Sequence, residues 1–252
     1  MKTSVTRKYI LEICTFNATD VVHAVAAGAD RIELCASYVE GGITPSSAAI
    51  TAAMQMIDPE NIVVMIRPRG GDFMYDDFEF DVMRHDILHC RSLGVKQVIF
   101  GITTPDGKLD VERNSRLIDT ASGMQCTLQR AFDLTRDPFE ALEDAITCGF
   151  TRILTSGQAN TAIEGKEIIK QLITSANNNI TLLPGAGVNS SNAREIIDYT
   201  GCNEIHTSAK RPFTPKSTSY NFNSNIYDTS HLTEVNPEEV HKLSAIIATY
   251  NS

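Results

Sequence analysis

The sequence lacks several features that would place the chain in a membrane or on a nucleic acid. It contains no apolar run of about 18 residues, so we expect no membrane-spanning helix. The N-terminal segment has no apolar stretch followed by a small-residue cleavage site, and we therefore expect a cytoplasmic protein without a signal peptide. No basic patch stands out, and the formal net charge is -9. These properties argue against nucleic-acid binding.

Other absences concern cysteine and glycine motifs. The six cysteines form no CxxC pair, which argues against a structural zinc site, and we expect scattered thiols in a chain of this size to be reduced. The dinucleotide-binding pattern GxGxxG does not follow the first apolar segment. What is present is a globular composition, with 42% hydrophobic and 21% charged residues among 252.

Short apolar segments alternate with helical patterns along the chain. This alternation predicts a parallel sheet covered by helices, and eight such units fit a (β/α)8 TIM barrel over about residues 8–210. An open doubly wound sheet is the alternative, which the missing GxGxxG pattern disfavours. The predicted strands are 8–16, 31–37, 61–68, 96–103, 125–132, 151–156, 180–184 and 203–208. The predicted helices between them are 17–29, 46–57, 77–93, 110–122, 137–147, 161–175 and 190–199.

The C-terminal part of the chain breaks this rhythm. Residues 210–235 are rich in Ser, Thr, Asn and Tyr, and we interpret them as a long loop over one barrel end or as an oligomer contact. A final helix is predicted over 236–249, with Asn236 as its N-cap and Pro237 in its first turn. We expect α/β architecture in a single domain, residues 1–252, in which 211–252 form the C-terminal loop and helix.

Polar side chains recur at the ends of the predicted strands, where the active groups of such barrels lie. Alternation places Glu12 and Cys14 on one face of the first strand, and Glu33 and Cys35 on one face of the second. Later strands add Arg67, Arg69, Gln129, Asp133, His206 and Ser208. Buried polar groups need partners. They either form a structural network, in which the glutamates neutralise the arginines of the third strand, or bind a ligand.

Two glycine-bearing stretches predict an anion site. IRPRGGDF (66–73) sets Arg67 and Arg69 around a proline, and their forked guanidinium groups suit a carboxylate or phosphate. LPGAGVNSSN (183–192) leads into a helix N-terminus, and the loops after strands seven and eight are the usual phosphate site of these barrels. Candidate contacts there and after strand six are Gly185, Gly187, Ser208, Lys210 and Ser156. The alternatives are a salt-bridged loop and glycines that only cap strands and helices.

The thiols suggest a different ligand. Cys14 and Cys35 are predicted on adjacent parallel strands about 4.8 Å apart, at equivalent heights, so the two sulfurs could share one soft ion such as Cu(I). His206 is a further candidate ligand across the barrel mouth. The alternative is that both cysteines are small core residues. His85 and His89 lie one helical turn apart without the HExxH glutamate, and we interpret them as part of a solvated helix face.

Eight motifs in chain order resemble the CutC family of copper homeostasis proteins: LEIC, GADRIELC, EGGITPS, IRPRGGDF, RAFD, RILTSGQ, GAGV and EIHTSA. The resemblance covers about residues 9–211. It implies a TIM barrel, a cytoplasmic location, a homodimer or higher homo-oligomer, and Cu(I) binding through Cys14 and Cys35. It maps a polar cleft onto Glu12, Glu33, Arg67, Arg69, Arg130, Asp133, Ser156 and His206. The histidine that usually precedes RAFD in the family is Gln129 here, which cannot transfer protons near neutral pH.

Two functions from different classes are consistent with the sequence. The first is a CutC-like copper-handling protein that holds Cu(I) between Cys14 and Cys35. The second is a TIM-barrel enzyme or sensor for a small anionic or phosphorylated metabolite. Its candidate catalytic residues are Glu12, Glu33, Asp133 and His206, and its candidate anion-binding residues are Arg67, Arg69, Arg130, Ser156, Gly185, Gly187 and Ser208. The sequence leaves open whether the protein catalyses a reaction.

Overall fold

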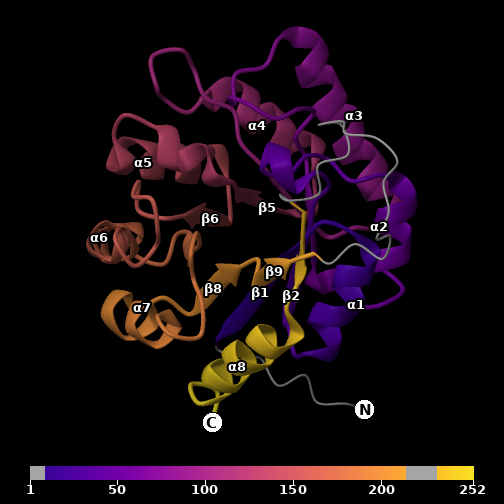
Figure 1. The fold of residues 1–252 in the computed structure, drawn as a ribbon. Coiled ribbons are helices and arrows are strands. Elements are labelled where there is room, and N and C mark those ends of the chain that lie inside the picture. The colour runs from indigo at the N-terminus through magenta and orange to yellow at the C-terminus, as the bar shows by residue number, and fades with distance from the viewer. Residues whose placement is uncertain (1–8, 214–231) are drawn as a thin grey trace, which may run out of the picture.

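The strands form the barrel that the alternation predicts. The computed structural model describes residues 9–213 and 232–252 (Figure 1). β1 (Ile10–Thr15) pairs in parallel with β2 (Arg31–Leu34) on one side and β8 (Glu204–Thr207) on the other. From β2 the sheet continues in chain order to β7, which lies next to β8, so the barrel is nearly closed. The remaining strands are β3 (Ile62–Met65), β4 (Gln97–Phe100), β5 (Gln125–Leu128), β6 (Arg152–Thr155) and β7 (Thr181–Pro184).

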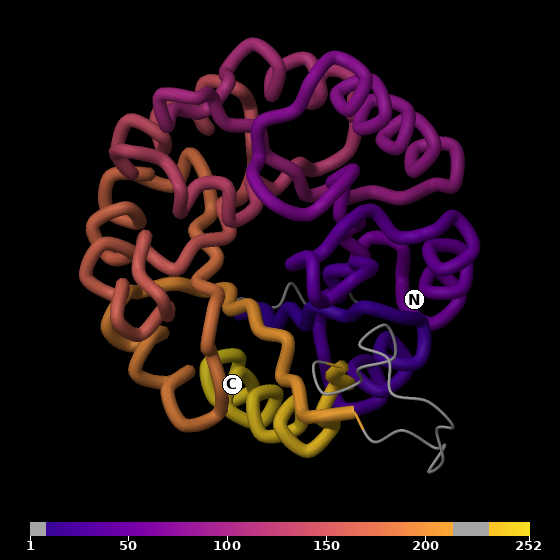
Figure 2. The backbone as a smooth tube through the Cα atoms, turned by 45° about the horizontal axis from the view of Figure 1, so that its top comes forward, coloured from indigo at the N-terminus to yellow at the C-terminus, as the bar shows by residue number. Residues whose placement is uncertain are grey.

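Helices surround the strands on the outside of the barrel (Figure 2). The α-helices are α1 (Ala18–Ala26), α2 (Ser47–Ala53), α3 (Asp77–Leu93), α4 (Val111–Thr120), α5 (Pro138–Cys148), α6 (Lys166–Ala176), α7 (Ala193–Thr200) and α8 (Pro237–Ala248). Three short 3-10 helices are η1 (Tyr38–Glu40), η2 (Pro59–Asn61) and η3 (Arg130–Leu134).

Side-chain caps explain where several helices begin. The Asn17 side chain accepts the Asp20 N–H at the start of α1. At α8, Asn236 accepts the Glu238 N–H and Pro237 occupies the first turn, which confirms the predicted start of the final helix. Because each cap satisfies a helix N–H that has no partner within the helix, these polar residues set the boundaries between loop and helix.

Several predicted boundaries differ from the structure, and three of them bear on the site. The predicted strand 125–132 ends at Leu128, and the RAFD stretch instead forms η3. The predicted helix 161–175 begins only at Lys166, after Gly165, which packs directly against the backbone of Ser156. The predicted loop 210–235 is paired at both ends, where β9 (Lys210–Pro212) and β10 (Thr233–Val235) run antiparallel. Residues 214–231 of that prediction lie outside the described residues.

The hydrophobic core has two layers. The larger lies between the strands and the surrounding helices and contains residues such as Leu11, Phe100 and Leu243. The smaller lies inside the barrel and consists of Cys14, Cys35, Val63, Met65, Ile99, Leu154 and Leu183. The barrel interior is therefore packed, and the two predicted metal thiols form part of its upper layer.

The C-terminal segment is tied to the barrel by hydrogen bonds. The Val235 N–H donates to the Asp20 carboxylate of α1, and the Asn236 N–H donates to the Ala209 carbonyl after β8. α8 then packs against β1 and α1 (Figure 1). This arrangement brings α8 next to the loops that follow β7 and β8.

Candidate functional site

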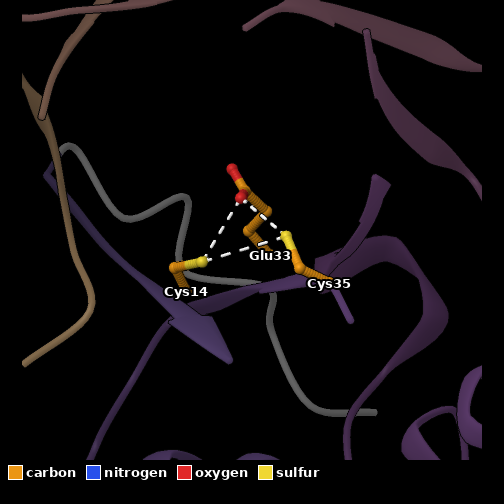
Figure 3. Close-up of side chains that lie close together, drawn as sticks. All are labelled: Cys14, Glu33 and Cys35. Atoms are coloured by element: carbon orange, nitrogen blue, oxygen red, sulfur yellow. Dashed lines mark hydrogen bonds between the residues drawn. The ribbon is translucent and has the colours of Figure 1, made fainter. Parts of the chain in front are cut away.

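Strand register brings the two predicted metal thiols together. Cys14 on β1 lies opposite Glu33 on β2, so Cys35 follows at the mouth end of β2 on the same inner face. The two sulfurs are 3.9 Å apart and both cysteines are free. Each thiol donates to Oε1 of Glu33, at 3.4 Å from Cys14 and 3.1 Å from Cys35 (Figure 3). A carboxylate and two thiols therefore meet at one point.

Burial determines the protonation of this triangle. Cys35 is 2% and Glu33 3% exposed. Burial, together with the adjacent Cys14 thiol and the Glu33 carboxylate, raises the pKa of Cys35 well above its ordinary value. Burial likewise raises the pKa of Glu33, although His206 opposes this change. The Cys35 thiol is consequently protonated near neutral pH, and a thiolate-seeking metal must displace that proton.

His206 on β8 approaches the triangle from the other side of β1. Its Nδ1 lies 2.7 Å from Oε1 of Glu12 and 3.8 Å from Oε2 of Glu33. Burial alone would lower the pKa of His206, but Glu33, Cys14 and Glu12 together hold it well above its ordinary value. Glu12 stays ionised: burial favours its neutral form, but Arg31 and His206 lower its pKa below the usual carboxyl range.

Deeper in the barrel, buried charges form a closed network. Arg31 donates to Glu12 and to Glu204. Arg152 also donates to Glu204, at 2.7 Å, and to the Thr127 hydroxyl at 3.1 Å. Each carboxylate in this layer meets a guanidinium group, which is the arrangement that buried charges require.

Sequence reasoning missed three members of this network. Glu204, Arg31 and Arg152 were not among the candidate residues, although alternation contains a signal for two of them. Glu204 precedes His206 by two residues, and Arg31 precedes Glu33 by two, so each shares the inner face of its strand.

The arginines of IRPRGGDF do not reach Glu12 or Glu33. Arg67 is buried, and its guanidinium donates to the carbonyls of Glu40, Gly42 and Gly71. Arg69 pairs with Glu79 at 2.5 Å and with Asp72 at 3.0 Å. Both side chains therefore hold loops in place. The glutamates, which were considered from the sequence as partners of these two arginines, pair with other groups.

A pocket of about 750 Å³ opens at the C-terminal ends of the strands. Cys14 and His206 line it, which connects the thiol and imidazole groups to the barrel mouth. Among the predicted anion contacts, Arg130, Gly187, Ser208 and Lys210 also line it. Arg67 and Arg69 do not contribute to its lining.

The two glycines of the GAG turn have separate roles. A Cβ on Gly185 would lie 2.5 Å from Leu154 Cδ1 and 3.2 Å from His206 Cδ2, so its small size lets the imidazole pack against β7. Gly187 has a φ of +69° and faces Thr161. Gly185 thus positions His206, whereas Gly187 contributes to the pocket lining.

The loop predicted as a phosphate site already meets a carboxylate. Glu239 of α8 accepts the Ser190 N–H at 2.6 Å and the Ser190 hydroxyl at 3.0 Å. The groups at the start of the α7 region that would bind an anion are therefore partly occupied by the protein's own side chain.

Asp133, Ser156 and Arg130 form a separate group after β5 and β6. Asp133 accepts the N–H groups of Ser156 and Gln158, and Arg130 Nε lies 2.8 Å from it. Arg130 also donates to the Ser156 hydroxyl at 3.0 Å. With its oxygens already engaged, Asp133 positions Arg130 at the edge of the pocket. The neighbouring Gln129 is 3% exposed, and its Nε2 has no hydrogen-bond partner within the described residues.

The histidines of HDILH lie on α3. His85 Nδ1 is 2.8 Å from the Asp81 carbonyl, and His89 Nε2 is 2.9 Å from the Ser47 hydroxyl. Both contacts are exposed, in agreement with a solvated helix face.

Fold and site together define a TIM-barrel protein with a buried thiol–carboxylate–imidazole cluster beneath a pocket at the C-terminal face. Residues 9–211 match the model of the CutC family, and the chain belongs to this family. A CutC family protein of Parabacteroides distasonis is 46% identical over 203 residues, which cover 81% of this chain and 84% of that protein. One from Chromobacterium violaceum is 45% identical over 203 residues, covering 80% and 81% respectively.

Solved structures agree with the fold. The crystal structure of the CutC protein from Streptococcus agalactiae, described as a candidate copper homeostasis protein, is 34% identical with a TM-score of 0.76. The match covers 79% of this chain and 98% of that one. A thiamine phosphate pyrophosphorylase from Pyrococcus furiosus is 14% identical with a TM-score of 0.60, covers 98% of both chains, and shows the fold alone. In residues 9–213 and 232–252, no helix is long and apolar enough to span a membrane.

Proposed function

We propose that this protein binds Cu(I) in copper homeostasis, with Cys14 and Cys35 as the ligands. The observation that carries the proposal is the 3.9 Å separation of the two sulfurs on neighbouring strands. Two thiolates that are each about 2.3 Å from a shared soft metal ion lie at most about 4.6 Å apart, so this spacing fits a bent or three-coordinate site. Thiolates are soft ligands that suit Cu(I).

Glu33 contributes to this site through its Oε1. It accepts a hydrogen bond from both thiols and so orients the two sulfurs toward one point (Figure 3). When copper replaces the thiol protons, the same oxygen lies close enough to act as a third ligand, because the three ligand atoms are within 4.8 Å of one another. The family resemblance adds a cytoplasmic location and a homodimer or higher homo-oligomer to the proposal.

Anaerobic Cu(I) titration against a competing chelator tests this function. Wild type should take up one tight equivalent, and the Cys14→Ser/Cys35→Ser variant should lose it. The matched control is Cys90→Ser/Cys126→Ser, because these cysteines are also buried but lie in the outer core layer, away from the mouth. Equal Cu(I) affinity in wild type and the Cys14/Cys35 variant would refute the proposal.

A second function, binding of a small anionic metabolite by an enzyme or sensor, has support from the pocket. The Arg130 side chain is 44% exposed, and Lys210 lines the same cavity. The N–H groups of Gly187 and Ser208 make no hydrogen bond to another described residue. These cations and amides suit a phosphate or carboxylate group. Glu12, Glu33, Asp133 and His206 remain the candidate catalytic residues.

Phosphate and phosphorylated metabolites tested by calorimetry would examine this second function. Arg130→Ala should weaken binding about tenfold, which corresponds to one lost charge-assisted hydrogen bond. Arg69→Ala is the matched control, because Arg69 is also exposed but lies outside the pocket. Equal loss of affinity in both variants would indicate a nonspecific charge effect.

A further inference from the structure

A second group of potential metal ligands lies beside the thiols. Glu12 on β1, Glu33 on β2 and His206 on β8 each offer one ligand atom, and these atoms lie within 4.8 Å of one another. All three residues are buried, with exposed fractions of 1%, 3% and 8% respectively. They come from three adjacent strands, so the barrel itself holds their spacing.

The distances within this group suit a small divalent cation. His206 Nδ1 is 2.7 Å from Glu12 Oε1 and 3.8 Å from Glu33 Oε2. Ligand atoms about 2.0 Å from a tetrahedral zinc ion lie about 3.3 Å from one another, and the two measured distances fall on either side of that value. Small movements of these side chains would be enough to surround an ion.

One carboxylate oxygen in the group accepts no hydrogen bond from a described residue. Glu33 Oε1 accepts both thiols, but Glu33 Oε2 is buried and accepts no hydrogen bond within the described residues. A buried carboxylate oxygen without a partner is unfavourable in a protein interior and indicates a ligand that the polypeptide does not supply. The oxygen faces His206 Nδ1, so that ligand would lie between the carboxylate and the imidazole.

The charges of the barrel interior are compatible with a cation at this position. Three buried carboxylates, those of Glu12, Glu33 and Glu204, face only two buried guanidinium groups, those of Arg31 and Arg152. One negative charge is left over in the barrel interior. In the ion-free protein a proton on His206 balances it, and a bound cation would take the place of that proton.

We propose that Glu12, Glu33 and His206 form a second metal site, which takes a borderline divalent cation of the zinc type. One imidazole and two carboxylates are ligands that such an ion accepts, whereas Cu(I) prefers the neighbouring thiols. His206 also lines the pocket, so an ion held by its imidazole would be reached from the barrel mouth. Three protein ligands and one open position are the arrangement of catalytic rather than structural zinc sites. This proposal does not depend on copper binding.

Cobalt(II) absorption on the full chain tests the second site, because the visible spectrum separates oxygen and nitrogen ligands from sulfur ligands. The Cys14→Ser/Cys35→Ser variant should bind one equivalent of Co²⁺ with a visible spectrum that has no sulfur-to-cobalt charge-transfer band, and Zn²⁺ should displace it. His206→Gln and Glu33→Gln should each weaken Co²⁺ binding by about 100-fold, because each removes one of three ligands. Circular dichroism and thermal melting confirm that both variants fold.

The control variant is His85→Gln/His89→Gln, which removes the exposed histidine pair of α3 and should leave Co²⁺ binding unchanged. Two results would overturn the second site: Co²⁺ binding that is lost with the α3 histidines, or Co²⁺ binding that is lost altogether in the Cys14→Ser/Cys35→Ser variant. The copper proposal fails separately, since it depends on Cu(I) affinity in the cysteine variant.

Discussion

The lower and upper layers of the barrel interior differ in how completely their polar groups are paired. In the lower layer, Arg31 and Arg152 meet Glu12 and Glu204 in an unbroken network. In the upper layer, two thiols share a single oxygen of Glu33, and its other oxygen accepts no hydrogen bond from a described residue. Both layers are buried, so burial alone does not distinguish them.

This difference separates two uses of buried charge. A network in which each ionised group meets its counterpart closes the barrel floor and leaves no position for a ligand. A cluster that lacks one partner keeps such a position, and here it lies next to the pocket. Unpaired atoms therefore indicate the functional layer better than the number of charges does.

The largest effect should come from breaking the lower layer. Arg31→Leu removes the guanidinium shared by Glu12 and Glu204 and leaves both carboxylates buried with fewer partners. We expect the free energy of unfolding in urea to fall by about 3–5 kcal/mol. Arg69→Ala, which breaks an exposed ion pair with Glu79, should lower it by less than about 1 kcal/mol. Similar losses in both variants would mean that the lower network contributes no more than surface charges.

An intermediate effect should follow from crowding the boundary between β7 and β8. In Gly185→Ala the new methyl group would meet Leu154 and the ring of His206. Because the Leu154 contact is with a flexible side-chain end, we expect a loss of about 1–3 kcal/mol of unfolding free energy rather than misfolding. Displacement of the imidazole should also weaken Co²⁺ binding in the same variant. Unchanged Co²⁺ affinity would show that the position of His206 is not critical to the upper layer.

The smallest change in stability is expected for Glu33→Gln, and the direction of the change depends on pH. Burial raises the pKa of Glu33, so the folded state binds its proton more tightly than the unfolded state does. Wild type then loses stability as pH rises through the folded-state pKa, whereas the glutamine variant does not. Near pH 4 the free energies of unfolding of the two proteins should differ by less than about 1 kcal/mol. At pH 8 the variant should be the more stable in urea, and the reverse order would contradict the raised pKa.

Much of the fold follows from local patterns in the sequence. Alternating apolar segments predict the order of strands and helices, and residues such as Asn17 and Asn236 mark helix starts through their own side chains. The end of β5 was missed because residues 129–132 contain no Gly or Pro that would signal a turn, while the backbone turns at Gln129 into η3. Local alternation does not reveal where the chain leaves the barrel wall.

For the site residues, the sequence predicts which face of a strand a side chain lies on, but not its height along the barrel axis. A period of two puts Arg67 inward, yet it follows the end of β3, so its guanidinium turns to loop carbonyls above the barrel. Arg31 begins β2, and its side chain therefore lies in the lower layer beside Glu12. The relative heights of residues on different strands depend on the stagger of the whole barrel, which no single segment encodes.

The two candidate metal sites also differ in how far apart in the chain their residues lie. Cys14 and Cys35 are 21 positions apart, within one strand–helix–strand unit, whereas Glu12 and His206 are 194 apart. Contacts between nearby residues close short loops and form early in folding, while distant ones wait for the chain to come together. The thiol pair can therefore assemble before β8 joins the barrel. A chain that folds in the presence of Cu(I) would meet the metal at its N-terminal unit first, and bound copper could then act as a template for folding of the barrel.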